Sequence, residues 1–373
     1  MSTGRPALCE HFRNLRDPRR DHLKQHLLMD IITIAVCGVI GGANTWVDME
    51  TFARNRQDWL AQFLQLPNGI PSHDTIERVF SLINPRSLQR CLLAWLRRIG
   101  EALDIKHIAI DGKSLRHSVK SSSPHQYLHL VSAWASEARL TLGQVAVDEK
   151  SNEITAIPRL LALLTVRGAL ITIDAMGCQK DIAAAIVEKG NDYVLLVKDN
   201  QEHLHEDIVN CLVQAYEEDG VGVQMDTFTA EETGHGREEK RTYTVLTNPQ
   251  GIRHQEAWRQ LKVIGQCTRE RTVAGKTSSE THYFIGSRKG SAKQYGEVLR
   301  DHWGIENNLH WQMDVTFAED ANRTQQREAA ENFGWLRRLA LMQLQKYTGK
   351  GSIRTHRYAA TLNIKVLEEV LNL

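Results

Sequence analysis

The 373-residue sequence lacks the patterns that define several common classes of protein. Its six cysteines are spread along the chain without a Cys-x-x-Cys pair, which argues against a zinc knuckle or a disulfide framework and favours reduced thiols. The most apolar stretch, residues 31–43, is too short to span a bilayer and too far from the start for a signal peptide. No internal repeat or low-complexity tract is present. We therefore expect a cytoplasmic protein that does not associate with membranes.

A strong net charge is absent as well, since the chain carries +1 at pH 7 and has a pI of about 7.7. The first 120 residues nevertheless hold 17 Lys and Arg against 12 Asp and Glu, a local excess that permits nucleic-acid binding without requiring it. Hydrophobic residues make up 42% of the chain, which is enough to bury a full core. This composition indicates one large domain with additions, or two to three domains.

The stretch "HIAIDGKSLR" at 107–116 contains the Gly-Lys-Ser with which a nucleotide-binding P-loop ends. That loop requires a second glycine five residues before Gly112, and His107 occupies this position. The residues between them have the pattern of a strand rather than of a flexible loop. The sequence therefore argues against a P-loop, and the acid in this stretch, Asp111, needs another explanation.

Residues 1–104 are predicted to form a helical domain. Segments such as "NRQDWLAQFLQL", "SHDTIERVFSLI" and "SLQRCLLAWLRRIG" space their apolar residues as a helix does. Asp74 and Glu77 have the spacing of a capping box that would begin one of these helices. The arm before the helices carries Arg13, Arg19 and Arg20. These arginines either contact DNA phosphates or belong to a solvated charged segment.

Residues 105–373 are predicted to form an α/β domain with a mixed sheet and flanking helices. Three strand-like runs, "HIAIDG", "YLHLVSAWAS" and "LTLGQVAVD", are joined by short links that suit antiparallel neighbours. A helix opened by Pro158 comes next, and then "ALITIDAMG", "QKDIAAAIVEKG" and "DYVLLVKD" alternate strand, helix and strand, which requires a parallel portion of sheet. Residues 205–290 break this order and are predicted to form an inserted β-rich subdomain before helices resume.

Two acids occupy the same setting in the sequence. Asp111 and Asp174 each end an apolar strand-like run and are followed closely by a glycine. Ligands gather at the carboxyl ends of parallel strands, where two such acids on neighbouring strands can meet. Carboxylates held together repel each other unless a cation lies between them, and hard oxygen ligands suit Mg²⁺ or Mn²⁺. Either acid taken alone is also explained as a cap of the turn that follows it.

A third acid, Glu306, lies in the segment "YGEVLRDHWGIENNLHWQMDVTFAED". As one helix, this segment puts Glu306 on the same face as Leu299 and Met313, which should pack toward the sheet and carry the carboxylate inward. After Glu306 the segment contains three further acids that would lie off this face or beyond the helix: Asp314, Glu319 and Asp320. We therefore predict that Glu306 is the third metal ligand.

Three motifs, "AIDGKSLR", "ITIDAMGCQKDIA" and "HWGIENNLHWQMDVTFAEDANR", resemble the H-repeat-associated transposases of bacterial insertion sequences, and the resemblance covers essentially the whole chain. These are DDE transposases with a ribonuclease H-like catalytic domain. The resemblance implies that Asp111, Asp174 and Glu306 form the catalytic Asp-Asp-Glu triad and hold two Mg²⁺ ions. It also implies an enzyme that nicks transposon ends and transfers the freed 3′-hydroxyl strand to target DNA. The expected partners are double-stranded DNA, as terminal inverted repeats and target, and a second copy of the chain.

The sequence departs from a broader group of related transposases around Glu306. That group has a tyrosine, an arginine and a lysine where this chain has Leu299, His302 and Met313. Candidates for phosphate contacts near the triad are Lys113, Arg116 and His302. For Lys113 and Arg116 the alternative is a surface cation without a role.

Three other functions fit parts of the sequence. A ribonuclease H-like nuclease without strand transfer would use the same acids and metals. A catalytically inactive DNA-binding remnant would keep the fold, although all three acids are present. A zinc hydrolase would use imidazoles such as His302 and His310, but the His-Glu-x-x-His motif is absent. Trp303 and Trp311 are predicted to pack in the core or at an interface rather than to stack on DNA bases.

Overall fold

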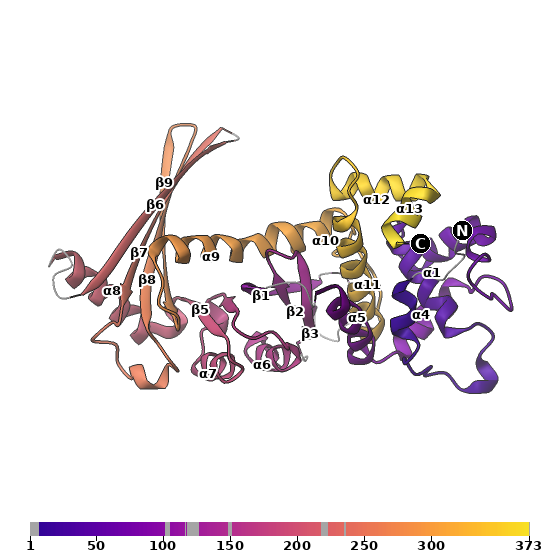
Figure 1. The fold of residues 1–373 in the computed structure, drawn as a ribbon, viewed down its shortest axis with the longest axis horizontal. Coiled ribbons are helices and arrows are strands. Elements are labelled where there is room, and N and C mark those ends of the chain that lie inside the picture. Colours follow the sequence, from indigo (N-terminus) through magenta and orange to yellow (C-terminus); the bar gives the residue numbers. More distant parts are fainter. Residues whose placement is uncertain are drawn as a thin grey trace.

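The structure is a computed structural model that describes residues 7–100, 105–115, 117, 127–147, 151–217, 223–234 and 236–372. The molecule is elongated, with a helical body containing both ends of the described chain at one end and long β-hairpins projecting at the other (Figure 1). The strands are β1 (His107–Leu115), β2 (Leu128–Ala135), β3 (Leu140–Ala146), β4 (Leu170–Ile173), β5 (Asp192–Val197), β6 (Gln224–Gly234), β7 (Arg237–Thr247), β8 (Val263–Val273) and β9 (Lys276–Gly286). The α-helices are α1 (Leu28–Ile40), α2 (Trp46–Asn55), α3 (Gln57–Leu60), α4 (His73–Leu82), α5 (Pro85–Gly100), α6 (Glu153–Leu163), α7 (Lys180–Glu188), α8 (Glu202–Glu217), α9 (Ala292–Ile305), α10 (Trp311–Val315), α11 (Arg327–Lys346), α12 (Ile353–Leu362) and α13 (Ile364–Leu371).

All nine strands form one mixed sheet in the order β3-β2-β1-β4-β5-β9-β8-β7-β6. The first three strands are antiparallel, whereas β1, β4 and β5 run parallel to one another. Crossover helices α6 and α7 make these parallel connections, as the alternation in the sequence predicted. The predicted mixed sheet flanked by helices is confirmed.

The predicted insertion at 205–290 differs from what the structure shows in two ways. Its first part is not β-rich, because residues 202–217 form helix α8. Its four strands do not make a separate sheet, since β9 pairs antiparallel with β5 between Val194–Val197 and Tyr283–Gly286. Backbone hydrogen bonding therefore continues from the central strands into the projecting hairpins. Strand periodicity predicts strands but does not show which edge they join.

Helices cover both faces of the central sheet. Buried Ile, Leu and Val side chains of β1, β4 and β5 pack against α6, α7 and α8 on one face. On the opposite face, α9 runs across β1, β4, β6 and β7 (Figure 1). Pro158 does not open a helix as predicted, because α6 begins at Glu153 and contains this proline. The earlier start matters for the site, since it places Glu153 at the helix end that faces β1.

Both ends of the chain build the helical body. Its core joins side chains of α1, α2, α4 and α5 to those of α11, α12 and α13. Hydrogen bonds cross the same boundary, including Trp46 Nε1 to Thr324 Oγ1 at 3.0 Å and Trp59 Nε1 to a Glu368 carboxylate oxygen at 2.8 Å. The division at residue 104 therefore separates stretches of sequence rather than independent cores. None of the described helices is both long and apolar enough to cross a membrane.

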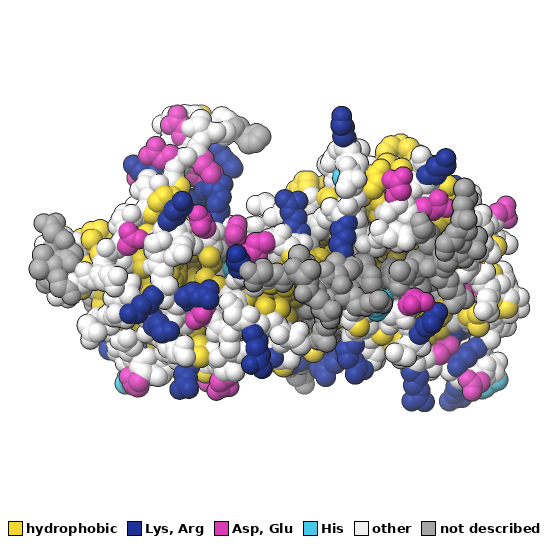
Figure 2. All heavy atoms as spheres, viewed as in Figure 1, with side chains coloured by type: hydrophobic (Ala, Val, Ile, Leu, Met, Phe, Trp, Pro, Cys, Tyr) yellow, Lys and Arg dark blue, Asp and Glu magenta, His cyan; other side chains and the backbone are white. Residues whose placement is uncertain are grey.

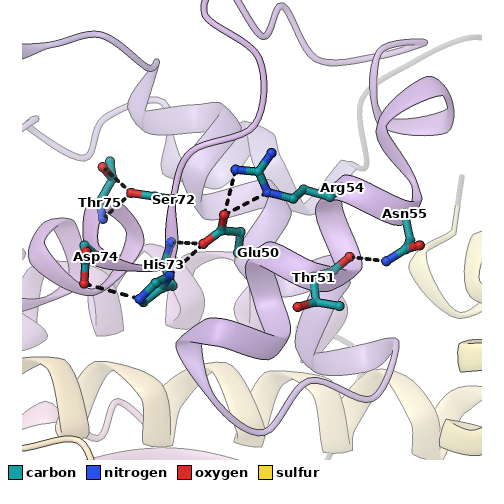
Figure 3. Close-up of polar contacts among 8 residues, drawn as sticks. All are labelled: Glu50, Thr51, Arg54, Asn55, Ser72, His73, Asp74 and Thr75. Carbon is teal, nitrogen blue, oxygen red and sulfur yellow. Dashed lines mark hydrogen bonds and ion pairs between the residues drawn. The ribbon is translucent and has the colours of Figure 1, made fainter.

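Helix α4 illustrates how the helical body fixes its local geometry. Its N-cap is Ser72, whose hydroxyl accepts the backbone N–H of Thr75, and not the predicted pair of Asp74 and Glu77. Glu50 of α2 accepts the backbone N–H of His73 at 2.7 Å and also contacts its ring (Figure 3). Hydrogen bonds from His73 and Arg54 hold the pKa of Glu50 down at about 2. This carboxylate therefore ties the start of α4 to α2.

Candidate active site

Asp111 and Asp174 occupy equivalent levels on adjacent parallel strands. The pairing of β1 with β4 runs from His107 opposite Leu170 to Ile110 opposite Ile173. Asp111 and Asp174 are the residues that directly follow the last of these pairs. Asp174 follows the end of β4, as predicted. Asp111 does not end its strand, because β1 continues to Leu115 while paired with β2 alone. The two acids therefore lie where the parallel part of the sheet ends.

Several acids lie close enough to Asp111 for their charges to act on it. Burial raises the pKa of Asp111 to about 7, and the charges of Asp174, Glu153 and Glu306 act in the same direction. The N–H of Gly112 donates to Asp111 Oδ1 at 2.9 Å and opposes this shift. For Asp174, burial and then the charge of Glu153 raise the pKa. Asp174 also caps the turn after β4 by accepting the N–H of Gly177, so the turn-capping role considered for it is present too.

Glu306 lies at an interruption of the long helix. Residues Glu306–His310 form a π turn between α9 and α10, and such turns often occur at functional sites because the wider turn changes which side chains face inward. Glu306 is exposed, whereas its neighbours His302, Ile305 and Leu309 are buried. The prediction that packing carries Glu306 inward is therefore wrong. The carboxylate lies at the solvent side of the site, close enough for its charge to raise the pKa of Asp111.

Two other acids of this segment, Asp314 and Glu319, are engaged in ion pairs. Asp314 pairs with Lys113, and the fully buried Glu319 pairs with Arg338 at 2.9 Å. Lys113 also lies 3.5 Å from Glu319 and donates to the carbonyl of His310 at 3.4 Å. Lys113 is therefore a buried link between β1 and the π turn, and its ammonium group is not presented to solvent. Neither Asp314 nor Glu319 has a carboxylate free of a cation.

Sequence reasoning missed Glu153, a fourth acid of the site. Oε1 of Glu153 lies at hydrogen-bonding distance, 2.7 Å, from Nε2 of His129. Nδ1 of His129 lies 2.8 Å from the hydroxyl of Ser114. A Cβ on Gly112 would lie 2.2 Å from this same Oε1, so only glycine fits beside the carboxylate. The sequence offered one signal, the glycine directly after Asp111, but nothing that identified what approaches it.

Two further side chains lie at the site, and of these only Lys198 was not considered from the sequence. Lys198, exposed directly after β5, lies close enough for its charge to lower the pKa of Asp174. His310 places Nδ1 3.4 Å from Asp111 Oδ2. Burial, together with the charges of Arg338 and Lys113, lowers the pKa of His310 to about 3, so its ring is neutral at pH 7. Trp311 is 53% exposed on α10, so it does not pack in the core, and the alternative that it packs at an interface stays a prediction.

Other predicted DNA contacts lie elsewhere. His302 is buried and bonds Thr172 Oγ1 at 2.8 Å, so it contributes to packing of α9 on the sheet and reaches no solvent-facing surface. Arg19 is also buried, with hydrogen bonds to both carboxylate oxygens of Asp17. Arg13 and Arg20 are exposed in the helical body. Arg116 lies outside the described residues.

The donor set suits a hard cation. In the described part of the chain, no three Asp, Glu, His or Cys side chains converge as a preassembled metal site. The four acids nevertheless present only carboxylate oxygens, the ligands that Mg²⁺ and Mn²⁺ prefer, and their mutual repulsion at Asp111 is what a bound cation would relieve. The imidazoles near them are hydrogen-bonded within the protein or buried, which does not fit a zinc site built on histidine.

Comparison with known proteins decides the family. A model described as "Transposase DDE domain" matches residues 102–343, and one described as "DDE_Tnp_1-associated" matches residues 9–96. The chain belongs to the DDE transposase family. It is 38% identical to the "H repeat-associated putative transposase YhhI" of Escherichia coli (strain K12), over 90% of this chain and 89% of that protein. It is also 38% identical to the "Putative transposase YncI" of Escherichia coli O157:H7, over 98% and 94%.

Among solved structures, the chain is similar to a piggyBac transposase in a synaptic complex with hairpin DNA. The TM-score is 0.42 at 11% sequence identity, and the match covers 95% of this chain and 75% of that one. A shorter relative, the "Inactive transposase YbfQ" of Escherichia coli (strain K12), is 43% identical over 20% of this chain. The resemblance noted in the sequence is thus confirmed, and the protein is a DDE-family transposase.

Proposed function

We propose that this transposase nicks the ends of its element and joins the freed 3′-hydroxyl strand to target DNA, with Asp111, Asp174 and Glu306 as catalytic metal ligands. The observation that carries the proposal is the meeting of acids around Asp111, whose pKa rises to about 7 because burial and three neighbouring carboxylates oppose its ionisation. An arrangement that repels its own charges is costly to the fold, and it becomes favourable when a divalent cation occupies it.

Each residue has a distinct part in this proposal. Asp111 and Asp174, on rigid strands of the sheet, hold the inner side of the metal site, and Glu306 closes it from the solvent side. Two bound Mg²⁺ ions, or Mn²⁺ ions, would supply activation of the attacking oxygen and stabilisation of the leaving oxygen. His310 contacts Asp111 and so orients its carboxylate. Glu153, held by His129, adds a fourth carboxylate beside Asp111 and Asp174.

DNA approaches the solvent side, where Glu306 and Trp311 are exposed. Lys198 is the cation that we expect to contact a phosphate there, in place of the buried Lys113 and His302. Arg13 and Arg20 of the helical body, and Arg116, remain proposed contacts to DNA farther along the duplex. We further propose that two copies act together on paired ends in the cytoplasm, since both ends of an element must be processed.

The test uses the purified full-length protein, Mg²⁺ and duplex DNA that carries the ends of its own element. Nicks at those ends followed by joined products are expected, and Asp111→Asn, Asp174→Asn or Glu306→Gln should each reduce cleavage at least about 1,000-fold while DNA binding persists. Asp181→Asn, at an exposed acid of α7, is the matched control and should cleave normally.

The products separate the rival functions. Nicks without joined products would replace this proposal with a ribonuclease H-like nuclease. End binding without any nick, in Mg²⁺ and in Mn²⁺, would indicate a DNA-binding protein that has lost catalysis. Wild-type cleavage by the Glu306→Gln variant would show that the third ligand lies elsewhere.

A further inference from the structure

A second polar pocket lies away from the acids, at the open edge of the sheet. It has a volume of about 340 Å³ and forms where β3, α5, α6 and α11 meet. No residue of the proposed catalytic site lines it. Its polar lining comes from Asn84, Arg86, Gln89, Gln144, Arg159, Arg327 and Glu331.

Positive charge dominates this lining. Arg86, Arg159 and Arg327 come from three different helices and face one acid, Glu331. Arg86 lies in the first turn of α5 and Arg327 in the first turn of α11, so the positive ends of two long helix dipoles also point here. In the space-filling view, Lys and Arg side chains gather along the lower edge of the molecule at the ends of these helices (Figure 2).

The floor of the pocket contains amides that lack partners. Gln89 and Gln144 are 2% and 0% exposed. Within the described part of the chain, neither Nε2 of Gln89 nor either amide atom of Gln144 has a hydrogen-bond partner. An unsatisfied buried polar group costs about 1–3 kcal/mol. Nε2 of Gln89 is a buried donor without a partner in an arginine-rich pocket, which indicates that a ligand with hydrogen-bond acceptors satisfies it.

Glu331 fits the same kind of ligand. Its carboxyl group lies among the three arginines, yet burial raises its pKa to about 7. A neutral carboxyl group is a hydrogen-bond donor, whereas a carboxylate would repel an anion. The pocket therefore offers guanidinium and amide donors to a compact anion, and a carboxyl donor as well below about pH 7.

The sheet register places this pocket two strands away from Asp111. Gln144 and Ala146 of β3 pair with Ser132 and Leu130 of β2. In turn, Ser132 and Leu130 pair with Asp111 and Lys113 of β1. Strands lie about 4.8 Å apart, so the level of Asp111 is about 10 Å from that of Gln144 across the sheet. A DNA strand rises about 3.4 Å per nucleotide, so this distance corresponds to roughly three nucleotides.

We propose that the pocket binds a phosphate group, supplied by the DNA backbone about three nucleotides from the bond that is cut. Arg159 and Arg327 contact the phosphate oxygens, Gln89 donates from the floor of the pocket, and Arg86 closes the rim. The residues of the pocket by themselves indicate a phosphate ligand, whereas the assignment of this phosphate to DNA rests on the proposed function. A phosphate seated here would fix the duplex relative to Asp111 without reading its sequence.

The decisive variant is Gln89→Leu, because it removes the amide while nearly preserving volume. If Gln89 had only a structural role, losing an unsatisfied amide would leave ligand binding unchanged. Arg159→Ala tests the charge, and Arg90→Ala is the matched control, since Arg90 is exposed one turn beyond Arg86 on α5 and does not line the pocket. Far-ultraviolet circular dichroism confirms that each full-length variant folds.

The first measurement is the melting temperature of the full chain with and without inorganic phosphate. We expect phosphate to stabilise the wild type and Arg90→Ala, and to lose this effect in Gln89→Leu and Arg159→Ala. The second is the salt dependence of binding to duplex DNA of arbitrary sequence, without Mg²⁺. Loss of one phosphate contact in Arg159→Ala should reduce the slope of log affinity against log salt by about 0.9.

The outcomes separate the source of the phosphate. A reduced DNA slope identifies the DNA backbone. Stabilisation by inorganic phosphate with an unchanged DNA slope identifies a free phosphate ion. Absence of both effects overturns the pocket as a phosphate site. Neither measurement involves cleavage, so a failure of the proposed catalytic function leaves this result readable, and the reverse also holds.

Discussion

Two groups of charged side chains lie next to each other near the π turn and have opposite electrostatic character. In one group, Glu319 is fully buried with Arg338 and Lys113 around it, and these cations lower its pKa to about 2. In the other, Asp111 is partly buried among further acids, and its pKa rises to about 7. Both carboxylates are removed from water, so the difference comes from the charges placed around them.

Under the proposed function, this difference separates structural acids from the acids that hold metal ions. A carboxylate surrounded by the protein's own cations is already satisfied and has little to offer an external metal ion. A carboxylate surrounded by other acids leaves the folded protein with charge that an added cation can neutralise. Both groups consist of Asp and Glu residues, and the partners brought by the fold distinguish them.

The largest loss of stability should come from breaking the ion pairs around Glu319. Arg338→Met leaves Glu319 buried without its closest cation, and removing one partner of a buried pair costs about 3–5 kcal/mol. Urea unfolding of the full chain measures this loss of free energy of unfolding. Arg354→Met, at an exposed arginine of α12, is the control and should change stability by less than about 0.5 kcal/mol. A similar small change in Arg338→Met would remove the distinction between the groups.

In metal-free buffer, the two groups should make the stability of the fold depend on pH with opposite signs. The pKa of Glu319 is lowered from 4.5 to about 2, so its contribution is full above pH 4.5 and is lost as the pH falls toward 2. The pKa of Asp111 is raised from 3.8 to about 7, so its contribution is lost as the pH rises through that interval. Each group changes stability by up to about 1.4 kcal/mol per pH unit.

Melting curves from pH 3 to 8 in the presence of a chelator test this sign. Asp111→Asn should flatten the decline in stability between about pH 4 and 7, and Glu319→Gln should flatten the loss of stability below pH 4.5. Identical profiles for Asp111→Asn and the wild type would show that Asp111 is not strained by its neighbours.

Glu153 is an intermediate case between the two groups. It lies among the acids around Asp111, but the imidazole of His129 lies beside it. Glu153→Gln should weaken Mn²⁺ binding about 10–100-fold, which is the usual effect of removing a group that supports a metal site. Titration calorimetry with Mn²⁺ and no DNA measures this directly. Glu188→Gln, at an exposed acid of α7, should bind Mn²⁺ as the wild type does. Unchanged affinity in Glu153→Gln would place Glu153 among the structural acids.

The smallest effect distinguishes two lysines. Lys198→Ala should weaken DNA binding by about 1 kcal/mol and reduce the salt slope by about 0.9, because an exposed ammonium group contacts one phosphate. Lys113→Met should instead lower stability while leaving the salt slope unchanged, since Lys113 is buried with Asp314 and Glu319. DNA binding at several salt concentrations measures both, and exchanged phenotypes would contradict the assignment.

The sequence allowed prediction of those features that depend on local pattern. Asp111 and Asp174 were identifiable because each follows a run of residues that is buried on both sides, and such runs form the centre of a parallel sheet. The order of strands and helices followed from the same periodicity. Neither inference required knowing which residues meet across the fold.

Features that depend on distant contacts were not predictable. Glu153 is an ordinary glutamate at a helix start, and it reaches the site only because α6 returns across β1. His302 and Lys113 look like surface side chains in sequence, but Thr172 and Glu319 lie far from them along the chain. The π turn at Glu306–His310 shifts the helical phase without any glycine or proline inside it to signal the change.

The shared core of the helical body has a consequence for synthesis of the protein. Helices α1 to α5 leave the ribosome first, but the apolar faces of α11 to α13 that complete their core are made last. At roughly 5–20 residues per second, the intervening chain takes on the order of 10–50 s to translate. During that interval the first helices expose hydrophobic surface that chaperones can recognise. A chain interrupted before α11 would lack the partner for that surface, so the core of the helical body can close only when translation is almost complete.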